Sequence, residues 1–262
     1  YSTSDSSLAN WSQPAVHWVA VVLMIFGGLP FTLYVATLRG NRKALLKDHQ
    51  VRGFLGFLLA TWLIFGTWLW LHSDNSWLDA FRIVAVNVTS VVTTTGYALG
   101  DYSTWGSFAV LLFFYLTFVG GCSGSTSGGL KIFRFQVAYV LLKSNLQQLV
   151  HPRAVIKQQY NNHNLDEEIV RSLITFSFFF TITIGVIALG LTLLGLDWVT
   201  ALTGAATAVC NVGPGLGPII GPAGNFSSLP DAAKWLLTIG MLLGRLEILT
   251  VLVLVTRAFW RH

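Results

Sequence analysis

Charged residues are scarce in this chain, at 10% of 262 residues, whereas hydrophobic residues make up 53%. A soluble protein of this length needs more polar residues to cover its surface, so the composition excludes the water-soluble globular class. The mean hydropathy of +0.63 instead predicts an all-α protein that crosses a lipid bilayer several times. Stretches long enough to cross about 30 Å of hydrocarbon as helix are residues 15–38, 53–72, 107–142 with an internal break, 172–195 and 233–256.

Cysteine is also rare, with only Cys122 and Cys210, and both lie in segments predicted at membrane depth, so no disulfide is expected. Of the 16 Lys and Arg residues, 13 fall on one side of the predicted spans. By the positive-inside rule this side is cytoplasmic. The net charge of +5 is spread over separate loops without interleaved aromatic residues, which argues against nucleic-acid binding.

Two segments, residues 77–93 and 196–210, are too short for full spans and lie between full spans. If they crossed completely, the basic linkers would fall on opposite sides of the membrane, so we predict that they enter and return as re-entrant pore helices. Irregular backbone at membrane depth is tolerated only where it is buried in protein or lines water. The polar stretches after these segments are therefore expected to surround an aqueous path; the alternative is a pair of ordinary extracellular loops.

These two polar stretches belong to a sequence repeat. Leu78 precedes Gly96 by eighteen residues and Leu196 precedes Gly213 by seventeen, which indicates duplicated structural units. Residues 1–5 match residues 97–101 at both ends. We therefore expect the chain to begin inside a further copy and to be part of a longer protein.

The chemistry of the polar stretches favours a monovalent cation. A pore helix directs its partially negative carbonyl end toward the membrane centre, and an extended run after it can present backbone carbonyls in place of the hydration shell of an ion. Gly96 and Gly213 allow the backbone turn that this arrangement needs. Neither stretch contains an acidic side chain, which argues against a divalent-selective carboxylate ring.

A run rich in glycine, serine and threonine interrupts the third apolar stretch. Because each glycine disfavours helix by about 1 kcal/mol relative to alanine, this run predicts a flexible bend at mid-membrane. Its residues, here called the glycine-rich loop, are Gly120, Gly121, Cys122, Ser123, Gly124, Ser125, Thr126, Ser127, Gly128 and Gly129.

Two other interpretations of this run stay open at this point. One is close helix packing through small residues. The other is a rhomboid-like intramembrane serine protease, because Gly121 to Gly124 fits the pattern Gly-x-Ser-Gly. That chemistry requires a histidine base within hydrogen-bond reach of the serine, and the six histidines all lie in loops or near predicted span ends, which disfavours it. A phosphate-binding loop is excluded because no Gly-Lys-Ser/Thr follows the glycines.

Arg245 is expected near the middle of the last span, where a charge costs about 2.5–3.5 kcal/mol on insertion scales. It should therefore face water or a partner. We predict that it lies in the ion pathway as an electrostatic barrier able to contact the glycine-rich loop. The alternative is a structural ion pair with an acidic group.

Four motifs, in this order, resemble the membrane subunit of bacterial Trk-type potassium uptake systems, which belong with the TrkH, TrkG, Ktr and HKT proteins. They are Thr93 to Tyr97, Gly120 to Lys131, Asn211 to Gly217, and Gly244-Arg245-Leu246-Glu247. The resemblance covers essentially the whole chain. It implies potassium-channel-like repeats of helix, pore helix and helix around a central ion pathway, in a multi-pass protein of the bacterial inner membrane.

The resemblance divides the chain into three parts. Residues 1–47 would end the second pore repeat, 48–160 would form the third and 161–262 the fourth. It also implies backbone-carbonyl filter strands at Thr94, Thr95, Gly96 and Tyr97 and at Asn211, Val212, Gly213 and Pro214, with K⁺ at Thr94, Thr95, Asn211 and Val212. Potassium channels use Thr-Val-Gly-Tyr-Gly, whereas Ala98 follows Tyr97 here, so potassium selectivity is a weaker expectation than cation conduction.

The resemblance further implies that the glycine-rich loop and Arg245 form an intramembrane gate and that the protein is not an enzyme. Potassium would be the transported ion, and no organic cofactor is expected in this chain. Expected partners are the lipid bilayer, the missing N-terminal repeats, a second copy in a homodimer, and a cytoplasmic nucleotide-binding regulatory ring of RCK type. A transporter selective for sodium, or for no particular monovalent cation, is the alternative function.

Overall fold

The computed structural model describes residues 7–154, 157–161, 163–246, 248–257 and 259–260. The helices are η1 (Ser7–Asn10), α1 (Pro14–Gly28), α2 (Phe31–Leu38), α3 (Ala44–Lys47), α4 (His49–His72), α5 (Trp77–Val92), η2 (Tyr102–Thr104), α6 (Ser107–Phe118), α7 (Ile132–Val150), α8 (Glu167–Leu193), α9 (Trp198–Cys210), α10 (Asp231–Arg245) and α11 (Ile248–Val255). Four two-residue strands complete them: β1 (Val119–Gly120), β2 (Leu130–Lys131), β3 (Gln159–Tyr160) and β4 (His163–Asn164). Residues 1–5 and Glu247, which figured in the sequence motifs, lie outside the described residues.

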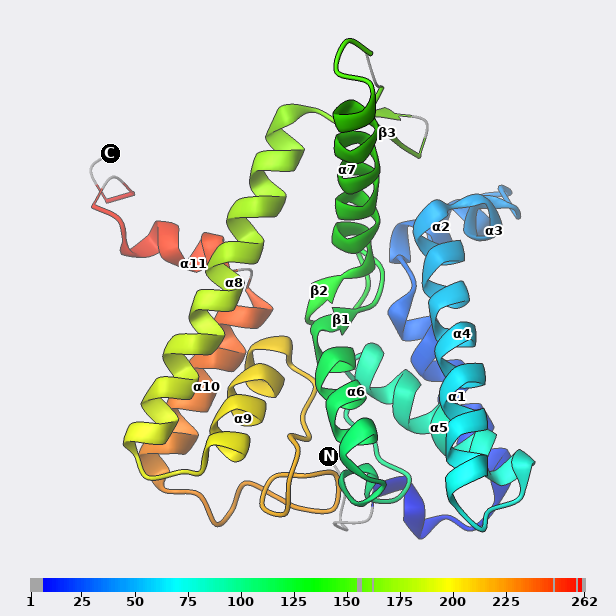
Figure 1. Ribbon diagram of the computed structural model, residues 1–262, viewed down its shortest axis with the longest axis vertical. Coiled ribbons are helices and arrows are strands. Elements are labelled where there is room, and N and C mark those ends of the chain that lie inside the picture. Colours follow the sequence, from blue (N-terminus) through cyan, green and yellow to red (C-terminus); the bar gives the residue numbers. More distant parts are fainter. Residues whose placement is uncertain (1–6, 155–156, 162, 247, 258, 261–262) are drawn as a thin grey trace.

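The helices form two groups on either side of a central column. In Figure 1, α6 and α7 lie end to end between α1–α5 on one side and α8–α11 on the other. Helix α5 packs against α1, α4 and α6, and α9 packs against α6, α8 and α10. Helix α6 thus contacts both predicted pore helices and joins the two groups.

The predicted pore helices are the most buried part of the fold. In α5 every residue from Val84 to Val92 is buried, and in α9 every residue from Thr203 to Cys210 is buried. By contrast, only 28% of the apolar window of α4 and 22% of that of α8 is buried, although both helices are long and apolar enough to cross a membrane. The long helices α4 and α8 therefore leave most of their surface uncovered by the described part of the chain, while α5 and α9 lie inside it.

Side-chain caps set where these helices begin. Asp48 Oδ1 accepts hydrogen bonds from the N–H groups of Gln50 and Val51 at the start of α4. Ser76 caps α5, and Asp197 accepts the N–H of Thr200 at 3.0 Å to cap α9. Such caps satisfy amides that have no partner within the helix, so both re-entrant segments start at defined residues.

The first predicted span, residues 15–38, is wrong as a single helix. It breaks between α1 and α2, which meet at an angle of 93°. Pro30 lies at the break; it has no N–H to donate and disfavours helix at the residue before it. The break leaves the carbonyl groups of Gly27 and Gly28 at the end of α1 free to bind another segment.

The last predicted span, residues 233–256, is also divided. Helix α10 ends at Arg245, and α11 begins at Ile248. Arg245, expected near the middle of this span, therefore lies at the C-terminal end of a helix that stops before α11. At the C-terminus of α10 its positive charge faces the negative end of the helix dipole, which is a favourable position.

The predicted break in the third span is confirmed. Strands β1 and β2 pair in parallel, with Val119 opposite Leu130 and Gly120 opposite Lys131. The chain leaves α6, forms the glycine-rich loop, and resumes in α7 in the same direction. The end of α6 and the start of α7 are thus joined directly by backbone pairing, and the loop is an excursion between them.

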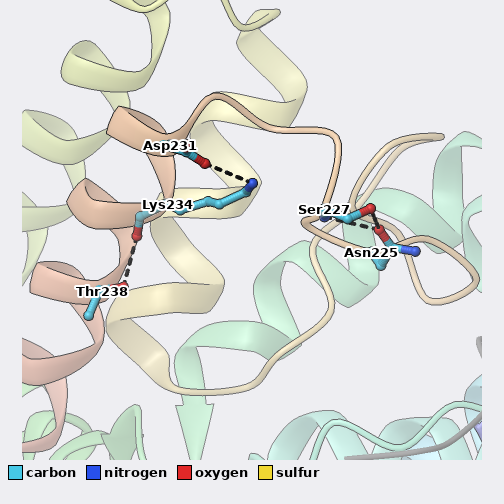
Figure 2. A network of polar contacts seen from close by, with 5 residues as sticks. All are labelled: Asn225, Ser227, Asp231, Lys234 and Thr238. Atoms are coloured by element: carbon cyan, nitrogen blue, oxygen red, sulfur yellow. Dashed lines mark hydrogen bonds and ion pairs between the residues drawn. The ribbon is translucent and has the colours of Figure 1, made fainter.

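The connection after α9 is fixed by local polar contacts (Figure 2). Asn225 Oδ1 accepts the backbone N–H of Ser227 at 3.0 Å and also its hydroxyl. In the first turns of α10, Lys234 Nζ lies 3.1 Å from Asp231 Oδ1, and the Thr238 hydroxyl donates to the Lys234 carbonyl at 2.8 Å. Lys234, a basic residue outside the predicted cytoplasmic group, is therefore paired within its own helix.

Candidate ion pathway

The two predicted filter strands, residues 94–97 and 211–214, have the same backbone pattern. Thr94 and Gly96 have positive φ angles of 55° and 82°, and Asn211 and Gly213 have positive φ angles of 58° and 117°. Left-handed backbone at two alternate positions is what the glycines were expected to allow. At Thr94 it was not expected, because this conformation is unfavourable for a β-branched residue.

The amide groups of both strands bond back to their own pore helices. The N–H groups of Thr94 and Thr95 donate to the carbonyls of Val91 and Ser90 at 3.1 and 2.8 Å, and the Gly96 N–H is 3.5 Å from the same Ser90 oxygen. In the other strand the N–H groups donate to the Ala208 carbonyl, the Thr207 carbonyl and the Thr207 hydroxyl at 3.0–3.1 Å; the donors are Asn211, Val212 and Gly213.

The carbonyl groups of the same six residues behave differently. Within the described part of the chain, none of the carbonyl oxygens of residues 94–96 and 211–213 accepts a hydrogen bond. Backbone carbonyls away from water need a partner, because an unsatisfied polar group is costly. Each strand therefore has its donors satisfied by protein and its acceptors available for water or a cation.

The two strands meet at their glycines. A Cβ atom on Gly96 would overlap the carbonyl oxygen of Val212, and a Cβ atom on Gly213 would lie 3.7 Å from Gly96 Cα. Val212 itself is buried, with 2% of its surface exposed. The structure thus brings together the two repeats' predicted filter residues, which are 117 positions apart between Gly96 and Gly213.

The glycine-rich loop lies against the broken end of α1. The N–H of Cys122 donates to the Gly28 carbonyl at 2.9 Å, and both the N–H and the hydroxyl of Thr126 donate to the Gly27 carbonyl at 3.3 and 3.0 Å. In return, the Gly124 carbonyl accepts the N–H of Phe31 at 3.0 Å. The bend between α1 and α2 therefore supplies both donors and acceptors to the loop.

The loop also touches both predicted filter strands, at Thr94 and at Asn211. The N–H of Gly128 donates to Thr94 Oγ1 at 2.7 Å. A Cβ atom on Gly128 would overlap the carbonyl oxygen of Cys210, the last residue of α9. Glycine is needed here because the backbone passes directly beneath the ends of both pore helices.

Arg245 contacts the loop from the other group of helices. Its Nη1 donates to the Thr126 carbonyl at 2.8 Å. Gly244, the preceding residue, allows this approach, because a Cβ atom there would overlap the carbonyl of Val209 in α9. Lys131 Nζ also donates to the Ser127 carbonyl at the end of the loop.

Ser123, the nucleophile of the protease alternative, has no catalytic surroundings. Its N–H donates to Gln50 Oε1 at 2.9 Å, and it lines a cavity of about 540 Å³ with Lys131, Arg134 and Glu168. Across the residues that the structure covers, no histidine hydrogen bonds to Ser123. The general base that the chemistry requires is therefore missing from the described site.

The sequence and the fold both match known proteins. A family model described as TrkH, a cation transport protein, matches residues 1–261. The chain belongs to this TrkH cation transport protein family. It is 57% identical over 263 residues to the Trk system potassium uptake protein TrkI of Halomonas elongata, and 32% identical over 264 residues to the Trk system potassium uptake protein TrkH of Escherichia coli.

The solved structure of a TrkH family member has the same fold. The crystal structure of the potassium transporter TrkH from Vibrio parahaemolyticus matches with a TM-score of 0.93 at 33% identity, over 100% of this chain and 56% of that one. The chain covers 53% of the Halomonas TrkI and 54% of the Escherichia TrkH, so it spans about half the length of these relatives.

The TrkH family match and the solved structure confirm the predicted helical membrane fold, and the family is one of cation transport proteins rather than enzymes. Sequence reasoning missed two groups of residues at this site. One is the bend at Gly27 and Gly28, whose signal was the following Pro30. The other is a set of polar residues inside the pore helices, including Asn87 and Thr203, whose signal was their presence on otherwise apolar helices.

Proposed function

We propose that the chain is the C-terminal part of a potassium uptake protein and supplies two of the strands that select the ion. The observation that carries this proposal is the set of six backbone carbonyls, at residues 94–96 and 211–213, without a partner in the described protein. Rings of such carbonyls replace the hydration shell of K⁺ in selective pores. The TrkI and TrkH relatives are named for potassium uptake.

The electrostatics of the site suit a monovalent cation. The C-terminal ends of α5 and α9, at Val92 and Cys210, lie directly before the two strands, so their partially negative dipole ends face the path. Carbonyl dipoles stabilise a cation without the full charge of a carboxylate. A divalent ion, which is harder to dehydrate, would lack the acidic ligands it prefers.

The glycine-rich loop is proposed as the gate beneath the filter. It is bonded to the end of α1 through Cys122 and Thr126, to Thr94 through Gly128, and to Arg245. Each neutral hydrogen bond contributes about 0.5–1.5 kcal/mol net, and a bond to a charged group about 1.5–3 kcal/mol. The loop would therefore be held in the closed conformation by several weak hydrogen bonds, and a conformational change elsewhere in the protein would be enough to break them. A cytoplasmic nucleotide-binding ring, as the family resemblance implies, is the proposed source of that change, and the working unit is proposed to be a homodimer.

Flux through the full-length protein in liposomes tests the function. Tracer uptake of K⁺ and of Na⁺ is measured under equal gradients, with protein-free liposomes as the control. We expect K⁺ uptake well above Na⁺ uptake. Equal uptake of the two ions would favour the alternative of a sodium-conducting or non-selective transporter. If a variant with altered gate residues takes up neither K⁺ nor Na⁺, the proposed cation pathway is refuted.

A further inference from the structure

A buried asparagine in α5 binds the chain just beyond the first filter strand. The side chain of Asn87 is fully buried, its Oδ1 accepts the N–H of Leu99 at 2.9 Å, and its Nδ2 donates to the Leu99 carbonyl at 2.9 Å. The same Nδ2 donates to the Ile83 carbonyl one turn earlier in α5 at 3.0 Å. Every polar atom of this amide is thus used, and two of its bonds are to a single residue three positions after Gly96.

A matching contact exists in the other repeat, although the side chain is different. The hydroxyl of Thr203 in α9 accepts the N–H of Leu216 at 3.2 Å and lies 3.3 Å from the Leu216 carbonyl. Leu216 is three positions after Gly213, as Leu99 is after Gly96. Because the hydroxyl has one proton and lies only 2.7 Å from the Val199 carbonyl, its donation to Leu216 is the weaker bond.

A buried polar side chain in a pore helix is unfavourable, and packing alone does not explain why one is present. Asparagine is a poor helix former, and an amide buried without partners is unfavourable by several kcal/mol in an apolar medium. If Asn87 served only to fill space in α5, an apolar residue of similar shape would do so more favourably. The position of both side chains therefore depends on the backbone that they bind.

The geometry of each strand follows from where it is attached. At the inner end, the amides of residues 94–96 and 211–213 bond to the pore helices. At the outer end, Asn87 or Thr203 binds the chain three residues beyond the glycine. Each run of free carbonyls is therefore held between two attachments to the same helix, which limits how far the carbonyl oxygens can move around a smaller ion.

We propose that Asn87 and Thr203 are positioning residues that set the carbonyl spacing of the two filter strands and thereby determine discrimination between K⁺ and Na⁺. The proposal rests on the proposed function of the strands. Neither side chain contacts the ion; each acts through the backbone of Leu99 or Leu216. Asn87, with two short bonds to its target, has the larger effect, and Thr203 the smaller.

The test is the ratio of K⁺ to Na⁺ uptake in liposomes, for the folded fraction of the full-length protein purified by size exclusion. Asn87→Leu keeps the branched shape of the side chain but removes its bonds to Leu99 and Ile83, and we expect the ratio of K⁺ to Na⁺ uptake to fall about tenfold or more. Thr203→Val should lower the ratio about fivefold, the equivalent of one hydrogen bond. Thr203→Ser, which keeps the hydroxyl, should have the wild-type ratio of K⁺ to Na⁺ uptake. Thr117→Val is the matched control, because the buried hydroxyl of Thr117 bonds only to Phe113 in its own helix.

The outcomes separate the two proposals. A wild-type protein that takes up K⁺ and Na⁺ equally would refute the proposed filter itself. A selective wild type with unchanged ratios in Asn87→Leu and Thr203→Val would refute the positioning role, whatever the yield of folded protein. If Asn87→Leu does not fold, the comparison of Thr203→Val with Thr203→Ser and Thr117→Val decides, because a merely structural hydroxyl would change yield and leave the ratio as it was.

Discussion

The hydroxyl oxygen of Thr94 accepts the backbone N–H of Gly128 at 2.7 Å, so a residue of the first proposed filter strand binds the glycine-rich loop directly. Thr94 makes this bond with a φ angle of 55°, a conformation that costs of order 1–3 kcal/mol for a non-glycine residue. The surrounding bonds therefore maintain an unfavourable backbone. The proposed filter and gate share one hydrogen bond, and a change in either one acts on the other.

This bond predicts a role for the Thr94 hydroxyl in closing the pathway. Thr94→Val removes the acceptor at almost constant volume, and we expect basal K⁺ flux to rise about fivefold because the loop loses about 1 kcal/mol of attachment. Thr94→Ser keeps the hydroxyl and should have nearly wild-type flux. The measurement is tracer uptake by full-length protein in liposomes without a regulatory partner; equal flux in the Val and Ser variants would show that the bond has no gating role.

The filter glycines give a second prediction. Gly96→Ser and Gly213→Ser should reduce the ratio of K⁺ to Na⁺ uptake by about tenfold or more, because a side chain at Gly96 overlaps the Val212 carbonyl and Gly213 has a φ angle of 117°. Gly106→Ser is the matched control. Gly106 has a similar φ angle of 111°, but a Cβ atom there would meet nothing within 4 Å. An unchanged ratio in both filter variants, at equal expression, contradicts the assignment of the strands.

Arg245 and the loop give a third prediction. Arg245→Ala removes the bond to the Thr126 carbonyl and a positive charge beside the proposed pathway, and deletion of residues 123–125 shortens the loop; both should raise basal K⁺ flux about tenfold. Lys234→Ala is the control for loss of a positive charge, since Lys234 is paired on the surface with Asp231. A structural role predicts poorer folding instead. Flux that falls or stays level in both variants, in normally folded protein, would return both features to structure.

The cap of α9 gives a fourth prediction, on stability. Asp197→Ala should lower the free energy of unfolding by about 1 kcal/mol, because the Thr200 N–H loses its acceptor. Asp197→Asn keeps an acceptor and should cost less. Asp166→Ala is the matched control, since Asp166 precedes α8 without making a side-chain cap bond. Unfolding in detergent, followed by circular dichroism, gives the comparison; equal losses for Asp197→Ala and Asp166→Ala would contradict the cap.

The same cap has a defined pH dependence. Hydrogen bonding from Thr200, whose backbone N–H donates to Asp197 Oδ2, holds the pKa of Asp197 below the ordinary value of 3.8. The native state therefore favours the ionised carboxylate, and its contribution to stability is present above pH 3.8 and is lost as the pH falls through the lowered native value. Asp197→Asn should remove this part of the acid dependence.

Much of the fold could be predicted from the sequence, because hydropathy and the positive-inside rule depend on runs of residues. The pore helices were placed within a few residues of α5 and α9, and the break after α6 was predicted from its glycines. The two breaks that were missed, after Gly28 and after Arg245, occur inside apolar runs. The carbonyls of Gly27 and Gly28 and the guanidinium of Arg245 bind the glycine-rich loop, which lies about a hundred residues away in the sequence. Local composition does not reveal such a distant partner.

The candidate site could be predicted only in part, because the local sequence shows which residues are glycine or polar but not which partners the fold gives them. Gly96 and Gly213 could be recognised because positive φ angles require glycine in most settings. Thr94 could not be recognised as left-handed, because its conformation depends on Gly128 and on the carbonyls of α5. Asn87 was visible as a polar residue in a pore helix, but its target, Leu99, is fixed only by the fold.

The parallel pairing of β1 with β2 has a consequence for how the glycine-rich loop can move. Because Gly120 and Lys131 stay paired while the chain between them is an excursion, the loop can change shape without any shift of α6 or α7. Loop motions of this kind take nanoseconds to microseconds, whereas sliding or tilting of helices takes microseconds to milliseconds. Opening by this loop would therefore not require the slower rearrangement of the spans.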